Sequence, residues 1–393
     1  MSALRCPITE DTQPPRLGAP WRAEIVDFCR FTEPTTAEAA TRLAAVERVR
    51  AVVVAIWPGA RLEVFGSCAT GLYLPTSDVD AVILDSGCSS PGDGLRALAL
   101  AVTRRGVGQR VALIAKARIP IIKFSEATSG LAFDISFDVA NGPAAASWMR
   151  AAMGALPPLR PLTLVLKAFL QQRELNEVYS GGVGSYALVV MLVALLRTHD
   201  AEWGPEPNLG ALLLAFLDLY GRQLNAEAVG VSASGFFSKA QRGWCDERRP
   251  ELLAVEDPRD GSNDLTRNSF NARAIRIAFE HAHRLLSAPA ETRTESLLGR
   301  VVHLDAALTG RAQLQGQGPI AAQPSLLLGQ QPDKAAEAAA TPGESKRQRK
   351  KKRAQAAALA AAQLEEGELP NDDGGEEDAP PRKKGKKARR AAE

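Results

Sequence analysis

Two aspartates that stand two positions apart, Asp78 and Asp80, have the clearest chemistry in this 393-residue sequence. They lie at the start of an expected β-strand, Val79–Leu84, and side chains two apart on a strand point to the same side. Two carboxylates held side by side repel each other unless a cation lies between them. The pair therefore predicts a site for Mg²⁺, an ion that proteins bind through one or two carboxylates together with substrate phosphates.

A glycine–serine step, Gly66 and Ser67, precedes the aspartates by about a dozen residues and ends an expected strand at Arg61–Phe65. Glycine lets the backbone approach a phosphate closely, and the nearby N–H groups and the serine hydroxyl are donors. Taken separately, a Gly-Ser step or an Asp-x-Asp pair is more often an ordinary turn at a strand end. In the order strand, Gly-Ser, short helix, Asp-x-Asp, strand, they indicate a nucleotidyl-transfer site.

A third carboxylate is expected on the strand Ala132–Val139. Its alternation puts Phe133, Ile135 and the other apolar residues on one face and Asp134 on the other. If this strand lies beside Val79–Leu84, Asp134 completes a cluster of three carboxylates.

Composition excludes several classes of protein. The chain is 45% hydrophobic, which is enough for a large core, and its five cysteines form no C-x-x-C pair. No apolar run of about 18 residues is present, so we expect no membrane contact. Residues 341–393 hold 14 basic and 10 acidic residues, which leaves 34 basic and 35 acidic residues elsewhere. A nearly neutral body predicts that RNA or DNA would be held by a local basic strip or by a partner.

The expected elements divide the chain into a mixed part and a helical part. Thr35 or Thr36 is a plausible N-cap for a helix at 37–57 whose apolar stripe starts at Leu43. From Ala144 to about Ser287 the pattern is mainly helical. The other expected elements are helices at 21–31, 95–104, 162–173, 187–196, 209–220 and 271–286, and strands at 110–115 and 119–126.

Several stretches together resemble a known family. The catalytic signature is similar to the DNA polymerase β-type nucleotidyltransferase superfamily. Longer stretches resemble, within it, the noncanonical nuclear poly(A) RNA polymerases of the TRAMP type. They are 64–80, 116–124, 133–137, 257–264 and 269–271.

The resemblance implies an α+β fold: a polymerase β-like nucleotidyltransferase palm with a mixed sheet, a helical central domain, and a disordered C-terminal tail. The implied organisation has five parts. They are an irregular N-terminus (1–19), a helix that joins the central domain (20–36), the catalytic domain (37–143), the helical nucleotide-recognition domain (144–290), and a low-complexity tail with basic blocks (291–393).

The resemblance also implies the roles of individual residues. Asp78, Asp80 and Asp134 match the metal-binding carboxylates of a two-ion site for Mg²⁺ or Mn²⁺. The nucleotide-binding positions are implied to be Gly66, Ser67, Asn141, Lys167, Ser185, Tyr186, Asn263 and Asp264. Without the family, Lys167 would be read as a surface lysine, Tyr186 as a core residue and Asn141 as a turn asparagine. Gln171 stands where some relatives carry a second cation.

The activity implied is transfer of AMP from ATP to RNA 3′ ends without a template. Asn263 stands near the position of a histidine in uridylyl-transferring relatives, which favours ATP over UTP. Two alternatives stay open: a terminal uridylyltransferase, and a catalytically inactive scaffold for RNA-processing factors. No RNA-recognition module is evident, so the implied partners are a zinc-knuckle RNA-binding protein, an RNA helicase and the nuclear exosome. The basic blocks 346–353 and 382–390 indicate a nuclear or nucleolar location.

Overall fold

The structure is a computed structural model that describes residues 19–115, 119–138, 141–198, 207–289 and 296–303. These residues all belong to one compact unit of the chain, residues 1–330. The predicted C-terminal tail and its basic blocks lie outside the described residues. None of the helices in the described part combines the length and the hydrophobicity that a membrane span requires.

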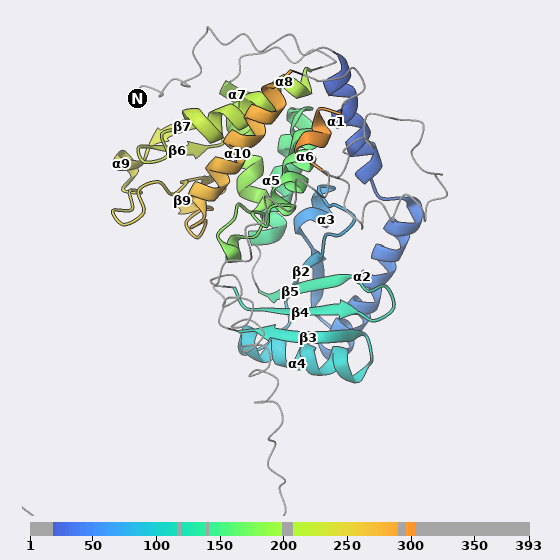
Figure 1. Cartoon of the computed structure of the whole chain (residues 1–393). Helices are drawn as coiled ribbons and strands as arrows, with labels where there is room; N and C mark the ends of the chain where they lie inside the picture. Colours follow the sequence, from blue (N-terminus) through green and yellow to red (C-terminus); the bar gives the residue numbers. More distant parts are fainter. Residues whose placement is uncertain (1–18, 116–118, 139–140, 199–206, 290–295, 304–393) are drawn as a thin grey trace, which may run out of the picture. The chain divides into compact units, whose positions relative to one another are not determined.

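The first half of the chain forms a mixed five-stranded sheet with the spatial order β1-β2-β5-β4-β3 (Figure 1). Strands β2 and β5 are parallel, and the other neighbours are antiparallel. The mixed sheet of the predicted α+β palm is therefore confirmed. The strands are β1 (Arg61–Val64), β2 (Val79–Leu84), β3 (Gly108–Ile114), β4 (Ile121–Glu126) and β5 (Ala132–Phe137).

Two helices cover one face of this sheet, α2 (Thr36–Ile56) and α4 (Pro91–Arg104). Thr35 caps α2 through a capping box, in which its hydroxyl accepts from the Glu38 N–H and the Glu38 carboxylate accepts from the Thr35 N–H. The predicted apolar stripe is wrong at its first member. Leu43 is exposed, because the face of α2 that packs on the sheet begins at Ala45 and Val46.

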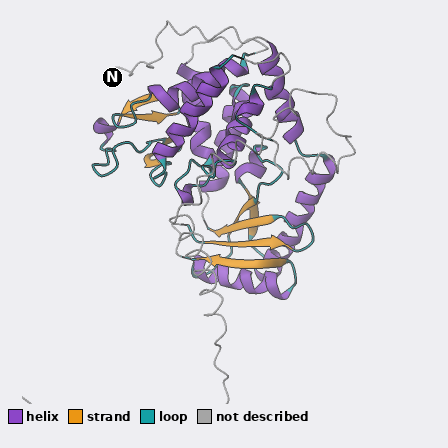
Figure 2. Ribbon diagram, viewed as in Figure 1, coloured by secondary structure: helices purple, strands orange, loops and turns teal. Residues whose placement is uncertain are grey.

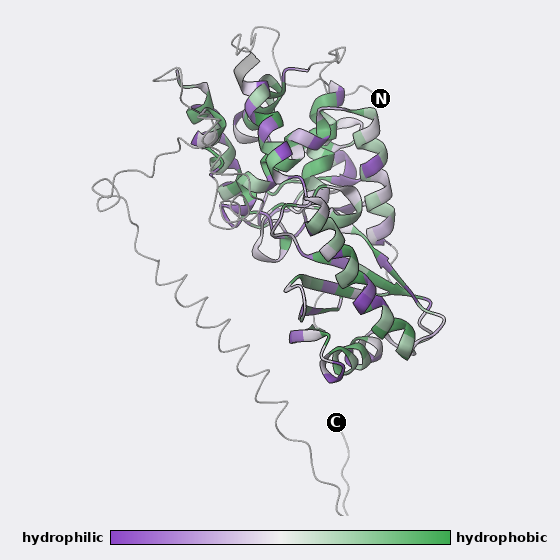
Figure 3. Cartoon of the chain, turned by 90° about the vertical axis from the view of Figure 1, so that its right-hand side faces the viewer, coloured by the Kyte–Doolittle hydropathy of each residue, from purple (hydrophilic) through white to green (hydrophobic). Residues whose placement is uncertain are grey.

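The second half is a helical domain built around α7 (Ser185–Thr198), of which all residues from Ala187 to Leu196 are buried. Helix α1 (Ala19–Thr32) contributes Trp21, Ile25 and Phe28 to the same core. Figures 2 and 3 show these helices by secondary structure and by hydropathy. The remaining helices of this domain are α5 (Asn141–Ala155), α6 (Leu159–Gln171), α8 (Leu209–Asp218) and α10 (Ala272–Ser287).

Two short hairpins interrupt the region that the sequence pattern described as mainly helical. One pairs β6 (Val229–Ser232) with β7 (Gly235–Ser238), and the other pairs β8 (Glu256–Asp257) with β9 (Asp260–Asp264). A short helix, α9 (Lys239–Arg242), follows β7. After α8 the backbone widens into a π-helical turn, η2 (Leu219–Gln223). Strands this short carry little periodicity, so the pattern did not reveal them.

Candidate active site

The three predicted carboxylates meet at one end of the central strand pair. Parallel pairing of β2 with β5 sets Asp80 opposite Asp134, and Asp78 comes directly before β2. One carboxylate oxygen from each of the three lies within 4.8 Å of the others, and all three side chains are partly buried. The condition placed on Asp134, that its strand lie beside Val79–Leu84, is met.

The electrostatics of this cluster suit a bound cation. Burial raises the pKa of Asp80 to about 7, and the negative charges of Asp78 and Asp134 act in the same direction. Burial also raises the pKa of Asp134, although an ion pair with Lys123 opposes the shift. Crowded carboxylates of this kind are stabilised when a divalent cation enters between them, and oxygen ligands are what Mg²⁺ and Mn²⁺ prefer. The residues present therefore fit a divalent metal site.

Gly66 lies directly against the carboxylate of Asp80. Its φ is +62°, and a Cβ at this position would overlap Asp80 Oδ2, so only glycine fits. The next residue, Ser67, is half-buried in the short helix α3 (Gly66–Thr70), and the described residues give its hydroxyl no hydrogen-bond partner. The Phe65 N–H donates to the Asp80 carbonyl at 2.9 Å, which ties the bend to β2.

Lys167 on α6 reaches from the helical domain to the same place. Its Nζ donates to the carbonyl of Leu72 at 2.7 Å. Burial lowers the pKa of Lys167 to about 8, while the charges of Asp80 and Asp78 oppose the shift. Lys167 is thus a partly buried cation within electrostatic reach of the carboxylates, not a surface lysine. One turn later, Gln171 Nε2 donates to Thr76 Oγ1 at 3.1 Å.

Two of the predicted nucleotide-binding residues, Tyr186 and Asn263, are joined by Asp257. We call these three residues the base side of the site, and the three carboxylates with Gly66 the metal side. The Tyr186 hydroxyl donates to Asp257 Oδ1 at 2.8 Å, and Asn263 Nδ2 donates to Asp257 Oδ2 at 3.0 Å. Burial and the bond to Asp257 raise the pKa of Tyr186. The ring of Tyr186 packs edge-on against Trp148, with 5.8 Å between ring centroids. Asp257 lies in the stretch 257–264, one of those that carry the family resemblance, but its bridging contact had no signal in the sequence.

The other predicted nucleotide-binding residues differ in their surroundings. Ser185 is the half-buried first residue of α7 and Asn141 is the exposed first residue of α5, and neither has a side-chain partner in the described residues. Asp264 Oδ1 accepts from the N–H of Val255 at 3.1 Å and from the N–H of Thr266 at 2.8 Å. That oxygen closes the β8–β9 hairpin, and a contact of Asp264 with nucleotide stays a prediction.

Two cations that the sequence reasoning missed support the carboxylates. Lys123 on β4 stands opposite Asp134 in the sheet register and forms an ion pair with it. Arg42 on α2 donates from NH1 to the carbonyl of Ser77 at 3.0 Å, next to Asp78, and its guanidinium lies 4.8 Å from the ring centroid of Tyr73. The strand alternation could have placed Lys123 on the metal side, but only once the strand order was known.

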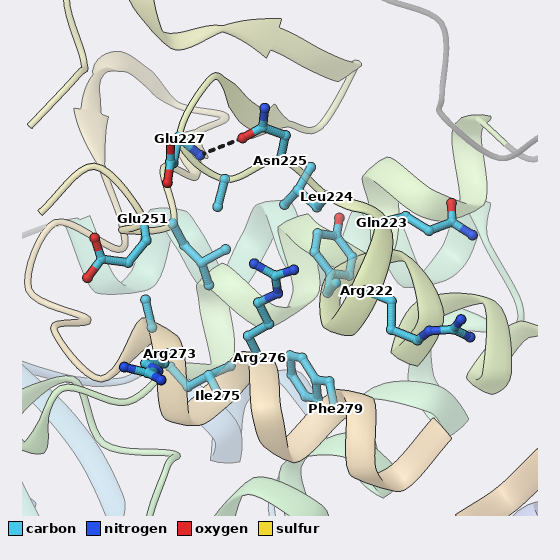
Figure 4. A pocket seen from close by; sticks show the side chains of 14 residues that line it. Arg222, Gln223, Leu224, Asn225, Glu227, Glu251, Arg273, Ile275, Arg276 and Phe279 are labelled. Carbon is cyan, nitrogen blue, oxygen red and sulfur yellow. Dashed lines mark hydrogen bonds between the residues drawn. The ribbon is translucent and has the colours of Figure 1, made fainter. Parts of the chain in front are cut away.

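A separate cavity of about 540 Å³ lies between η2, α10 and the loops at residues 224–227 and 251–253 (Figure 4). Arg273 and Arg276 of α10 line one side, and Glu227 and Glu251 line the other. Arg276 Nε donates to the Gly221 carbonyl at 3.2 Å. None of the predicted site residues lines this cavity, so it is distinct from the carboxylate site.

Comparison with known proteins finds two matching families along the chain. Residues 22–147 match the family described as "Poly(A) RNA polymerase, mitochondrial-like, central palm domain". Residues 208–263 match the family described as "Cid1 family poly A polymerase". The solved polymerase core of TRAMP, described as an RNA surveillance complex, is 36% identical and has a TM-score of 0.65; the match covers 72% of this chain and 93% of that one. A Cid1 poly(U) polymerase structure, at 23% identity and a TM-score of 0.58 over 69% of this chain and 95% of that one, shares the fold.

Curated proteins similar to this chain are also named as poly(A) RNA polymerases. Poly(A) RNA polymerase protein 2 of Saccharomyces cerevisiae is 37% identical over 67% of this chain and 47% of its own length. Inactive non-canonical poly(A) RNA polymerase protein Trf4-2 of Drosophila melanogaster is 33% identical over 71% of both chains. The chain spans less than half the length of the first curated relatives that it matches. The predicted resemblance is confirmed, and the chain belongs to the family of non-canonical poly(A) RNA polymerases of the TRAMP type.

Proposed function

We propose that this protein is a template-independent RNA adenylyltransferase that adds AMP from ATP to the 3′-hydroxyl ends of RNA. The observation that carries the proposal is the meeting of Asp78, Asp80 and Asp134 beside the Gly66 bend. Relatives that are named poly(A) RNA polymerases support the reaction class.

The carboxylates would hold two Mg²⁺ or Mn²⁺ ions, which lower the pKa of the RNA hydroxyl and neutralise the charge of the triphosphate. The protein's own residues position the reactants. Gly66 lets the Asp80 carboxylate lie directly against the bend, and the Ser67 hydroxyl next to it is available as a donor to a phosphate. Lys167 supplies a partly buried positive charge within electrostatic reach of Asp80 and Asp78.

The hydrogen bonds of Asp257 support a preference for ATP. An ionised carboxylate only accepts hydrogen bonds, so the amide nitrogen of Asn263 must face Asp257. The Asn263 oxygen is then left as the group that can meet a base. An acceptor at this point favours adenine, which presents an amino group, over uracil, which presents a carbonyl oxygen.

A catalytically inactive scaffold is the second candidate, because one relative is named as inactive. Extension of a single-stranded RNA oligonucleotide by purified protein, with each of the four nucleoside triphosphates in turn, separates the possibilities. We expect extension with ATP well above the other three. Preferential extension with UTP would favour a uridylyltransferase, and no extension with any nucleotide would favour the scaffold.

The double variant Asp78→Ala/Asp80→Ala tests the metal mechanism in the same assay. We expect it to abolish extension while circular dichroism and the unfolding midpoint show that the fold persists. Asp85→Ala is the matched control, because this aspartate follows β2 and its exposed carboxylate pairs with Arg61. Extension that survived the double change would contradict the proposal.

We further propose a role in nuclear RNA surveillance with a zinc-knuckle protein, a helicase and the exosome. The supporting observation is the match to the polymerase core of TRAMP. Strong, processive extension by the chain alone would argue against partner-supplied RNA binding. Imaging of a chain truncated at about residue 340 tests the nuclear or nucleolar location, since both basic blocks lie beyond that point.

A further inference from the structure

An exposed aromatic ring stands on the loop that joins the two helices of the candidate site. Tyr179 lies in the single turn η1 (Val178–Ser180) and is 85% exposed, more than any other large hydrophobic residue in the described part of the chain. The loop begins after α6, which carries Lys167, and ends at Ser185, where α7 starts. Burying such a ring would remove a large apolar surface from water.

The loop is held rigidly, so the exposure of Tyr179 is not that of a mobile tip. The carbonyl of Ser180 accepts from Asn271 Nδ2 at 2.6 Å, and the carbonyl of Gly181 accepts from the Asn271 N–H at 3.0 Å. Ser269 Oγ donates to the Gly182 carbonyl at 2.7 Å. Gly181 has a φ of +86°, and a Cβ there would lie 2.6 Å from the half-exposed ring of Phe270.

The loop lies within reach of the catalytic carboxylates. Gly182 N–H donates to the carbonyl of Glu177 at 2.8 Å, which fixes the backbone two residues before Tyr179. The pKa of Glu177 is raised by partial burial and by the charge of Asp78, while Lys123 opposes the shift. Glu177 therefore lies within electrostatic reach of Asp78 and Lys123, and Tyr179 follows it by two residues in the same loop.

We propose that Tyr179 is a stacking platform for a base near the 3′ end of a single-stranded RNA. The inference deepens the proposed function, on which it rests: an RNA whose 3′-hydroxyl reacts at the carboxylates would pass close to the loop that carries Glu177 and Tyr179. An exposed aromatic ring on a loop whose backbone is held by hydrogen bonds can stack on any base, since every base has a π-face, and needs no sequence-specific contact. Such a contact supplies an RNA-binding element in a chain without an evident recognition module.

The test uses the full chain with the variants Tyr179→Ala and Tyr179→Phe. Loss of one base stack is expected to raise the KM for a short single-stranded RNA by about 5- to 150-fold in Tyr179→Ala, with the KM for ATP unchanged. Tyr179→Phe retains the ring and should keep a KM close to that of the wild type. Ile277→Ala is the control, because Ile277 is also an exposed apolar residue, 53% exposed, but lies on α10.

Binding of a 5′-labelled RNA, measured by fluorescence anisotropy in EDTA, separates this inference from the proposed function. If the wild-type protein fails to extend RNA, and Tyr179→Ala still binds the RNA more weakly than the wild type does, the stacking platform is supported and the transferase is rejected. If Tyr179→Ala has the same affinity for the RNA and the same KM for the RNA as the wild type, the stacking platform is overturned. Equal losses in the Ala and Phe variants would also overturn it, because the hydroxyl rather than the ring would then be the contact.

Discussion

The metal side and the base side of the candidate site are held together in different ways. On the metal side, Asp80 and Asp134 face each other because the backbones of β2 and β5 pair in register. On the base side, Tyr186 and Asn263 come from α7 and β9 and meet only through the side chain of Asp257. Backbone pairing persists whatever the side chains are, whereas a side-chain bridge depends on one residue. The metal side should therefore be sensitive to backbone geometry, and the base side to single changes of side-chain chemistry.

Among changes that leave all three carboxylates in place, the largest expected effect is on the metal side, in Gly66→Ala. The new Cβ would overlap Asp80 Oδ2, so the bend or the carboxylate must move, and displacements of about 1 Å at a catalytic group can cost about 100-fold in rate. We expect kcat for RNA extension to fall by about that factor or more. Gly71→Ala is the matched control, with a φ of +70° and no atom within 4 Å of the added Cβ. It should lose about 1 kcal/mol of stability and little activity; equal activity in the two variants would refute the steric argument.

On the base side, the variant Asp257→Asn tests whether a single side chain sets the orientation of Asn263 and the nucleotide preference. Tyr186 and Asn263 donate to different oxygens of Asp257, and in the amide one of these positions becomes an NH2 group that cannot accept. One of the two bonds is therefore lost where it stands, and the orientation of the Asn263 amide is no longer fixed. We expect kcat/KM for ATP to fall about 10- to 100-fold, with a smaller ratio of ATP to UTP incorporation. Asp260→Asn at the tip of the same hairpin is the control. A preserved nucleotide ratio in Asp257→Asn would show that Asp257 does not set the selectivity.

A smaller effect, on stability alone, is expected for Lys239→Met in the helical half. Lys239 is 1% exposed, and its ammonium donates to the carbonyls of Ala226, Pro250 and Leu252 at 2.8, 3.1 and 3.1 Å. Methionine leaves these carbonyls without that donor, which should lower the free energy of unfolding by about 2 kcal/mol. Urea unfolding measures the change, with Arg273→Met as an exposed control. A loss below about 0.5 kcal/mol would show that water replaces the ammonium.

The smallest effect concerns pH and the sheet half. The buried carboxylate of Glu126 accepts two hydrogen bonds from Arg48, at 2.9 and 2.8 Å, and this pairing lowers its pKa. The folded pKa lies below the unfolded value of about 4.3, so the stabilisation is present above that pH and is lost as the pH falls. Glu126→Gln should therefore be less stable than the wild type at pH 7, by about 1–2 kcal/mol, and the difference should shrink below about pH 4. A difference that did not change with pH would exclude this linkage.

The sequence revealed the metal side far better than the base side, for a physical reason. Strand β2 is an apolar run that carries Asp80 near its start, and β5 alternates apolar and polar residues, so the positions of Asp80 and Asp134 on strands followed from the pattern. The predicted strand at 132–139 was too long, because β5 ends at Phe137. The family resemblance indicated a mixed sheet, while the register of β2 with β5 is long-range information that only the structure supplied. Asp138 departs from the strand alternation with a φ of +53°. Lys123 had no signal until β4 was placed beside β5.

The bridging contact of Asp257 could not be predicted, because it depends on a hairpin of two and five residues meeting a helix about 70 positions earlier in the chain. Nor could the triple contact of Lys239, since an isolated lysine in a turn-rich stretch is normally exposed. The resemblance nevertheless directed attention to the segment 257–264. The spacing of apolar residues locates helices and strands, but side-chain contacts between irregular segments depend on tertiary packing, which that spacing does not encode.

The crowding of Asp78, Asp80 and Asp134 has an evolutionary consequence. In the absence of bound cations, like charges held together and partly buried destabilise the folded chain, so replacing one of them by an uncharged residue should make folding easier. A duplicated copy released from selection on chemistry would thus gain stability as it lost the triad, and could survive as a folded protein with another use. Only continued selection for the nucleotidyl-transfer activity opposes the loss of these aspartates.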